Sequence, residues 1–389
     1  MFTKNSIIGV IGSGAMGSGI AQVAATAAHK VIVYDNNQTS LTKSETTLQA
    51  TLKKLVEKEK ITADQQTFIL ANISFVNSLN DLAKCDLVIE AIVENLQVKK
   101  TVFSELEKLV SETCVLASNT SSLSIASIAA ACAKPERVIG IHFFNPATLM
   151  PLVEIIPGIA TNDSITSSCK NLIDTWGKVT VIAKDTPGFI VNRVARPFYS
   201  EALRIYEEGI ADMPTIDWAM KEIAGFKMGP FELMDMIGHD VNYVVTETVW
   251  TQFYFDPKFK PALSQKRLLE AGFLGKKTGK GFYNYAADAQ IPQPTKDVEI
   301  GKAIVKRILF MLINEAADAL YLKVATREDI DLAMTKGVNY PKGLLKWADE
   351  LGVNLIVKEL TGLKDFYEED RYRVSPLLKQ NFIMKKSFY

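Results

Sequence analysis

A glycine-rich loop between a short apolar run and a helical run constrains the fold of this chain more than any other feature. The loop reads Gly12-Ser13-Gly14-Ala15-Met16-Gly17, follows the apolar residues 7–11, and precedes a helical pattern that begins near Ile20. Glycines at this spacing allow a tight turn at Gly12, a close backbone approach at Gly14, and close packing of helix on strand at Gly17. The pattern predicts the first strand–loop–helix unit of a parallel sheet.

Apolar runs recur through the first 185 residues and alternate with helical patterns. After 7–11, the expected strands are 31–34, 73–76, 87–91, 115–118, 138–141, 153–156 and 179–182, with a long polar-amphipathic helix over 38–59. Strands alternating with helices predict a Rossmann-type doubly wound α/β sheet.

The period changes after Asp185-Thr186-Pro187-Gly188, where helical patterns replace strand patterns. The helical part reads as an internal repeat with a gapless offset of 114 residues, for instance between Asp217 and Asp331 (331 − 217). We therefore expect two all-α domains after the sheet. The expected boundaries are 1–185 for the sheet domain, 186–285 for the first helical domain, 286–300 for a linker, and 301–389 for a second, degenerate helical domain.

Asp35 ends the second expected strand, 23 residues after Gly12. A dinucleotide would place its phosphates at the N-terminus of the helix that follows the glycine loop. Asp35 would accept hydrogen bonds from the adenosine ribose and repel a 2′-phosphate, and no arginine lies nearby in the sequence to attract one. The pattern predicts NAD rather than NADP.

Only three histidines are available for proton transfer near neutral pH: His29, His142 and His239. His142 follows the apolar run 138–141, which places it at the edge where open α/β sheets bind ligands. A histidine in such a place is ordinarily a satisfied core residue, but its position beside a dinucleotide site favours catalysis. We expect His29 on the surface and a structural role for His239.

Polar residues on the neighbouring strands reach the same edge. Asn119-Thr120-Ser121-Ser122 follows the strand 115–118, and Glu154 lies inside the apolar run 152–156. A carboxylate there is costly to bury unless it is paired, and a histidine is a suitable partner. The sequence leaves two alternatives equally open: Glu154 pairs with His142, or it faces solvent from an edge strand.

Composition excludes several classes of protein. The 389 residues are 48% hydrophobic and 23% charged, and the formal net charge is zero, so we expect no nucleic-acid partner. No signal peptide and no apolar run long enough to span a membrane is apparent, so we expect no membrane partner and a cytoplasmic location. The four cysteines lack metal-ligand spacing, so we expect no metal site.

Five segments in this order carry a family resemblance: the glycine loop, 94–96, 119–122, 142–146 and 185–193. Together they resemble the L-3-hydroxyacyl-CoA dehydrogenases of the 3-hydroxybutyryl-CoA dehydrogenase type, over residues 1 to 285. The tail resembles the second helical copy of longer members. The resemblance implies an NAD-dependent, reversible oxidation of (S)-3-hydroxyacyl-CoA.

The resemblance also implies site residues. His142 is then the general base and Glu154 orients it, while Ser121 and Asn192 donate hydrogen bonds around His142 and the substrate oxygens. The cofactor set is Gly12, Gly14, Ala15, Met16, Gly17, Asp35, Glu94, Lys99, Asn119, Ser121, Asn145 and Lys277. The residues implied to contact CoA are Thr51, Lys58 and Ser121, although the lysines of that helix could equally form a solvated face.

Two alternative functions remain: a dehydrogenase of a non-CoA hydroxy acid or sugar acid, and a non-catalytic relative like the λ-crystallins. The intact set of Ser121, His142, Glu154 and Asn192 argues against the second. In shorter relatives the helical domain mediates dimerisation, so the resemblance implies a homo-oligomer or a second copy that replaces that contact. Lys306 aligns with Asn192, which implies one active site per chain.

Overall fold

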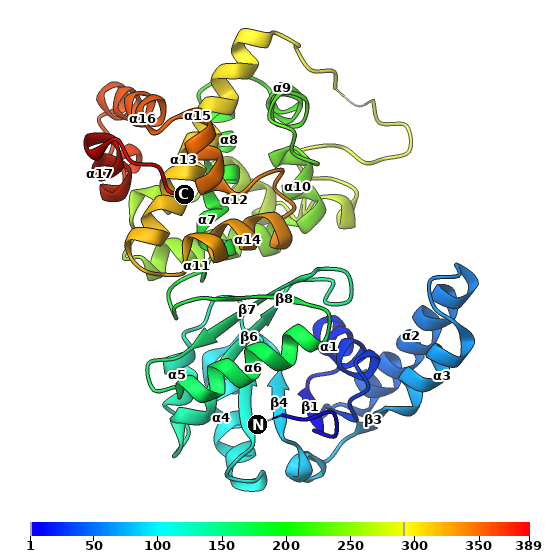
Figure 1. Ribbon diagram of the computed structural model, residues 1–389. Coiled ribbons are helices and arrows are strands. Elements are labelled where there is room, and N and C mark those ends of the chain that lie inside the picture. The colour runs from blue at the N-terminus through cyan, green and yellow to red at the C-terminus, as the bar shows by residue number, and fades with distance from the viewer. Residues whose placement is uncertain (1, 291) are drawn as a thin grey trace. The chain divides into compact units, whose positions relative to one another are not determined.

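The computed structural model describes residues 2–290 and 292–389. The chain forms two compact units, the first ending at Thr186 and the second beginning at Pro187. The first unit holds the sheet and the helices around it, and the second is helical (Figure 1).

An eight-stranded sheet with the order β3-β2-β1-β4-β5-β6-β7-β8 organises the first unit. Every neighbouring pair is parallel except β6 with β7, which is antiparallel. The strands are β1 (Ile8–Ile11), β2 (Val31–Tyr34), β3 (Ile73–Val76), β4 (Leu87–Glu90), β5 (Val115–Ser118), β6 (Val138–Phe143), β7 (Leu152–Pro157) and β8 (Val179–Ile182). The Rossmann-type sheet is confirmed, with one antiparallel pairing, so that β7 and β8 run opposite to the other six strands.

Strand β6 runs two residues further than its apolar run suggested. The sequence ended this strand at Ile141, but β6 continues through His142 to Phe143 because β7 pairs with it along that length. His142 therefore lies within the strand and not after it. Its place is set by ladder hydrogen bonds to β7, a partner that a single apolar run does not reveal.

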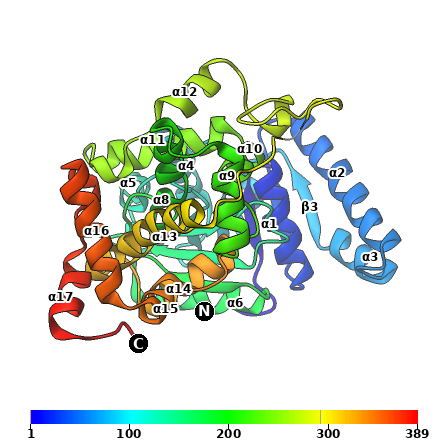
Figure 2. The same cartoon turned by 90° about the horizontal axis from the view of Figure 1, so that it is seen from above.

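Helices pack around the sheet: α1 (Ala15–Thr26), α2 (Gln38–Glu57), α3 (Ala63–Ala71), α4 (Leu96–Leu109), α5 (Ile125–Ala129) and α6 (Asp163–Thr175). The helix expected over 38–59 ends at Glu57, and the unforeseen α3 follows, started by a capping box between Thr62 and Gln65. Helices α2 and α3 lie side by side next to β3 (Figure 2). The core is formed by strand residues such as Val10, Ile89 and Ile141.

His29 is buried and not on the surface. Its side chain is 3% exposed, its Nδ1 lies 3.0 Å from the Ser6 carbonyl oxygen, and its ring lies 5.7 Å from that of Trp176. The prediction rested on a turn position before β2. It was wrong because the N-terminal segment and the end of α6 cover that turn.

The second unit consists of two sets of helices. The first set is α7 (Val191–Val194), α8 (Arg196–Glu207), α9 (Met213–Trp218), α10 (Pro230–Ile237), α11 (His239–Gln252) and α12 (Leu263–Glu270). The second is α13 (Val298–Tyr321), α14 (Arg327–Gly337), α15 (Leu344–Leu351), α16 (Val353–Tyr367) and α17 (Pro376–Met384). Helix α13 packs along α8 (Figure 2), and it begins inside the segment 286–300 expected as a linker.

The two sets of helices share individual hydrogen bonds at equivalent positions. Asp217 accepts from the backbone N–H groups of Phe231 and Glu232, and Asp331 accepts from those of Leu345 and Lys346, 114 positions further on. Both aspartates also accept from a tyrosine hydroxyl near the end of their own copy. The internal repeat predicted from the sequence is confirmed.

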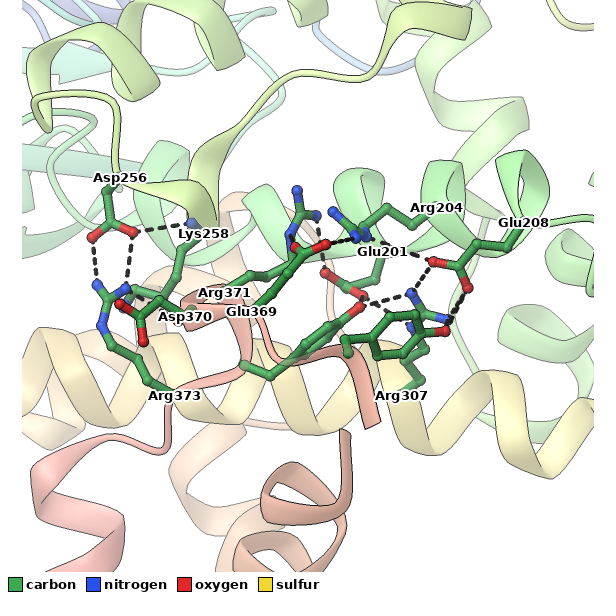
Figure 3. Close-up of polar contacts among 12 residues, drawn as sticks. Glu201, Arg204, Glu208, Asp256, Lys258, Arg307, Glu369, Asp370, Arg371 and Arg373 are labelled. Atoms are coloured by element: carbon green, nitrogen blue, oxygen red, sulfur yellow. Dashed lines mark hydrogen bonds and ion pairs between the residues drawn. The ribbon is translucent and has the colours of Figure 1, made fainter. Parts of the chain in front are cut away.

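Buried ion pairs join the two copies reciprocally. Arg193 of the first copy pairs with Glu315 of the second at 2.6 Å, and Arg307 of the second pairs with Glu201 of the first at 3.1 Å. Figure 3 shows the surrounding network, in which Arg371 also pairs with Glu201. These side chains are nearly inaccessible to solvent, so the network belongs to the interior of the unit.

Candidate active site

His142 and Glu154 form a buried pair fixed by strand register. They are directly opposite each other in the antiparallel β6–β7 ladder, and His142 Nδ1 lies 2.7 Å from Glu154 Oε2. Glu154 is 0% exposed and His142 is 5% exposed. The alternative in which Glu154 faces solvent is excluded, since β7 lies between β6 and β8. A carboxylate in this position holds the imidazole in one orientation.

Asn119 holds the end of β6 in place. Its Oδ1 accepts the Phe143 backbone N–H at 2.8 Å, and the Phe144 ring packs against the imidazole of His142 with centroids 4.5 Å apart. The side-chain carbonyl of Asn119 therefore links the end of β5 to β6. The side chain that the resemblance assigned to the cofactor therefore also has a structural contact beside the histidine.

Glu94 gathers the loop that follows β5. Its Oε1 accepts hydrogen bonds from the Thr120 hydroxyl at 2.6 Å, from the Ser121 N–H at 3.0 Å and from the Ser122 hydroxyl at 3.1 Å. Burial alone would raise the pKa of Glu94. The charge of Lys99 and these hydrogen bonds outweigh that effect, so the pKa lies below its ordinary value. An ionised Glu94 therefore fixes the backbone at Ser121.

Lys99 lies beneath this loop and not on an open surface. It is 1% exposed, and its Nζ lies 2.6 Å from Glu90 Oε1 and 3.2 Å from Glu94 Oε2. Glu90 in turn accepts from the Ser118 hydroxyl at 2.7 Å. Sequence reasoning missed Glu90, although it ends an apolar strand just as Glu154 interrupts one, and the same argument about buried carboxylates applied to it.

The glycine loop has the geometry its sequence predicted. Gly12 has φ +102°, and a Cβ at Gly17 would lie 1.8 Å from the Gly12 carbonyl oxygen, so both positions require glycine. A Cβ at Gly14 would meet no atom of the described chain within 4 Å. Packing inside the protein therefore does not require glycine at Gly14, whereas the close approach of a ligand would.

A cleft of about 900 Å³ opens above this loop. Gly12, Gly14, Ala15, Asp35 and Thr51 are among its lining residues. Helix α1 begins at Ala15, and none of the described side chains caps it, so its first N–H groups are available to phosphate oxygens. Met16 is partly buried and packs against the core.

Asp35 connects the glycine loop to the end of β2. Its Oδ2 accepts from the backbone N–H and the hydroxyl of Ser13, both at 2.8 Å, and its Oδ1 accepts from Asn37 N–H at 3.0 Å. Asp35 is also one of the residues that line the cleft. These features fit a dinucleotide with unphosphorylated ribose.

The remaining predicted residues belong to other elements of the two units. Thr51 and Lys58 are exposed on α2 and at its end, and Asn145 is exposed in the loop after β6. Asn192 and Lys277 belong to the second unit, where Lys277 forms an ion pair with Asp240. His239 is buried there with Nε2 2.9 Å from Asp235 Oδ1, as its expected structural role requires.

Two kinds of feature are absent from the described residues. No group of three or more histidine, cysteine or acidic side chains is arranged to hold a metal ion. None of the helices described is both long and apolar enough to cross a membrane.

The sheet, the glycine loop and the histidine–carboxylate pair define a dinucleotide-dependent dehydrogenase. The NAD-binding domain model of 3-hydroxyacyl-CoA dehydrogenase matches residues 7–186, and the C-terminal domain model of that family matches twice, at 188–285 and 304–387. The chain belongs to the 3-hydroxyacyl-CoA dehydrogenase family, is an enzyme, and uses NAD.

Curated relatives match this chain over one helical copy or over both. The chain is 37% identical to a 3-hydroxyadipyl-CoA dehydrogenase of Escherichia coli, with all of both chains covered. It is 42% identical to a 3-hydroxybutyryl-CoA dehydrogenase of Bradyrhizobium diazoefficiens over 73% of this chain and 97% of the relative. A crystal structure of 3-hydroxybutyryl-CoA dehydrogenase from Escherichia coli superposes with a TM-score of 0.92 at 36% identity, covering 98% of each chain. The function is NAD-dependent oxidation of a 3-hydroxyacyl-CoA.

Proposed function

We propose that His142 is the general base of this oxidation and that Glu154 positions it. The observation that carries the proposal is the 2.7 Å contact between His142 Nδ1 and Glu154 Oε2 across the β6–β7 ladder. With Nδ1 held by the carboxylate, Nε2 is the atom that takes the proton of the substrate's 3-hydroxyl. When bound, NAD supplies the hydride acceptor.

Ser121 and Asn192 donate hydrogen bonds to the substrate oxygens and around the imidazole. The support for Ser121 is its backbone, which Glu94 fixes at 3.0 Å. A donor held in place before the substrate arrives stabilises developing charge on oxygen without reorganisation at the moment of reaction. Glu94 and Lys99 thus act by ordering the loop, with Glu94 also at the cofactor.

The adenosine and pyrophosphate part of the cofactor site consists of Gly12, Gly14, Ala15, Met16, Gly17 and Asp35. The rest of the cofactor site consists of Asn119, Asn145 and Lys277. The open space at Gly14 supports a close backbone approach to phosphate. Thr51, Lys58 and Ser121 contact CoA. The support for Thr51 and Lys58 is their exposure on α2 and at its end, and Thr51 also lines the cleft.

The second helical copy takes the place of a partner subunit's copy, which leaves the chain with one active site. The reciprocal Arg193–Glu315 and Arg307–Glu201 pairs support this proposal, because a two-fold dimer interface has such repetition. A cytoplasmic location is also part of the proposal. It is supported by free cysteines, of which Cys85, Cys114 and Cys169 are buried.

A steady-state assay of acetoacetyl-CoA reduction by NADH tests the proposed function. We expect saturable turnover that yields only the (S)-alcohol, with His142→Ala at least 100-fold slower at saturating substrate. Turnover of a free hydroxy acid without CoA, together with none of acetoacetyl-CoA, would contradict the proposal.

A further inference from the structure

The first helical copy carries a loop that the second copy lacks. Asp235 accepts the backbone N–H of Phe282 at 2.9 Å, and its equivalent Asp349 accepts that of Phe388 at 2.8 Å. The two aspartates are 114 residues apart (349 − 235), but their donors are only 106 apart (388 − 282), so the first copy has eight more residues (114 − 106). Because α12 and α17 end 114 residues apart, the extra residues lie after α12. They form a loop that carries Lys277.

The extra loop closes on Asp235, which is fully buried. Gly275 donates its N–H to the Lys280 carbonyl at 2.8 Å, and this hydrogen bond joins the two ends of the loop. A Cβ at Gly275 would lie 2.2 Å from the Asp235 carbonyl oxygen, and a Cβ at Gly281 would lie 2.1 Å from Asp235 Oδ1. Both ends of the loop therefore lie directly against this aspartate, and the close approach requires glycine at both.

Asp235 is also surrounded differently from its equivalent Asp349. His239 Nε2 lies 2.9 Å from Asp235 Oδ1, and the Tyr285 hydroxyl donates to Asp235 Oδ2 at 3.0 Å. At the position equivalent to His239 (239 + 114) the second copy has Val353, whose side chain cannot donate a hydrogen bond. Asp235 is fully buried, whereas Asp349 is only partly buried. The histidine and the deeper burial occur in the copy that has the loop, which links them to the loop and not to the shared helical fold.

The side chain of Lys277 lies across the start of helix α11. A Cβ at Gly238 would lie 2.5 Å from Lys277 Nζ, and Lys277 forms an ion pair with Asp240. A Cβ at Gly352, the equivalent of Gly238 (238 + 114), would meet no atom of the described chain within 4 Å. The side chain of Lys277 is 43% exposed, so its ammonium group is accessible to a ligand. The loop thus holds one accessible cation at a defined place on the first copy.

We propose that Asp235, together with His239, is a positioning residue for cofactor binding, because it holds the loop so that Lys277 is in place before NAD binds. The inference rests on the proposed function, since it takes Lys277 as a contact of the cofactor. A cation that is already held in place loses less conformational entropy on binding than one on a free loop. A loosened loop should therefore weaken cofactor binding and leave proton transfer at His142 unaffected.

The test measures kcat and KM for NADH in the full-length enzyme, with acetoacetyl-CoA as the substrate. Asp235→Asn replaces one acceptor oxygen by an amide donor, and His239→Val introduces the residue of the second copy. In both variants we expect KM for NADH to rise by about 5-fold or more, the effect of losing one hydrogen bond, with kcat within a few-fold of wild type. Asp349→Asn is the matched control, because it changes the equivalent aspartate in the copy without the loop, and its KM should equal that of the wild type.

An unchanged KM for NADH in either Asp235→Asn or His239→Val would overturn the proposal. An equal rise in Asp349→Asn would also overturn it, because the effect would then come from general loss of helical packing. If Asp235→Asn does not fold, His239→Val decides alone, since it leaves the carboxylate and its backbone donors in place.

Lys277→Ala separates this inference from the proposed function. If KM for NADH rises in Lys277→Ala but in neither Asp235→Asn nor His239→Val, the cofactor contact stands and the positioning role is refuted. An unchanged KM for NADH in Lys277→Ala refutes both the cofactor contact and the positioning role. Turnover of acetoacetyl-CoA by the wild-type enzyme tests the reaction itself independently of these variants.

Discussion

Arg193 Nε lies 2.6 Å from Glu315 Oε1, so the second helical copy touches the residue adjacent to Asn192 in the first. Lys258 of the first copy adds a second cation 2.7 Å from the other oxygen of the same glutamate. Arg193 also donates its backbone N–H to the Gly188 carbonyl at 3.1 Å, where the chain enters the helical unit. Through Glu315, the second copy holds the segment that carries Asn192.

Glu315→Gln should therefore destabilise the protein strongly. The change leaves Arg193 without its buried counter-charge and Lys258 with Asp318 alone, and breaking a buried pair typically costs about 3–5 kcal/mol. Glu299→Gln is the control on the same helix, because its partner Lys302 is exposed and such pairs contribute less than ~1 kcal/mol. Urea unfolding of both variants measures the difference, and equal midpoints would contradict the role of Glu315.

The His142–Glu154 pair predicts a graded loss of activity. His142→Ala should lower kcat by roughly 100-fold or more, because it removes the general base. Glu154→Gln should lower kcat less and leave KM for NADH nearly unchanged, because the imidazole remains but loses the charge that orients it. Stopped-flow hydride transfer and NADH fluorescence titration measure the two effects. A kcat within a few-fold of wild type for His142→Ala would show that another group is the base.

Asp35 should determine the choice of cofactor. The wild-type enzyme should prefer NADH, since the carboxylate in the cleft repels a 2′-phosphate. Asp35→Ala should erode this preference, all the more because Lys43 also lines the cleft. The ratio of kcat/KM for NADH and NADPH gives the result, with Asp64→Ala on α3 as the exposed control. Comparable values for both cofactors in the wild type would refute this assignment.

The lowered pKa of Glu94 predicts a pH-dependent stability difference. A carboxylate whose pKa is lower in the folded state stabilises the fold above its unfolded pKa, and this contribution disappears as pH falls through the folded pKa. Glu94→Gln should thus be less stable than wild type at pH 7.5, and the gap should narrow as pH falls below 4.5. Urea midpoints at several pH values measure the gap. A constant gap would mean that the Glu94 charge contributes nothing.

The sequence by itself determined the sheet, the glycine loop and the repeat. Apolar runs matched the eight strands to within two residues at either end, because strands that are buried in the sheet consist of consecutive apolar residues. The spacing of Gly12, Gly14 and Gly17 determined the loop, since backbone conformation or packing requires glycine at Gly12 and Gly17, and Gly14 leaves space for a ligand. The repeat was visible because its two copies share one register.

Tertiary structure decided which distant residues meet. The sequence left Glu154 between two alternatives, and only the antiparallel register of β7 against β6 placed it opposite His142. Likewise, Glu90 met Lys99, and Arg193 met Glu315, through packing of elements far apart in the chain. Local patterns specify which faces are buried, but the partner of a buried charge depends on strand order, register and helix packing, which are properties of the whole fold.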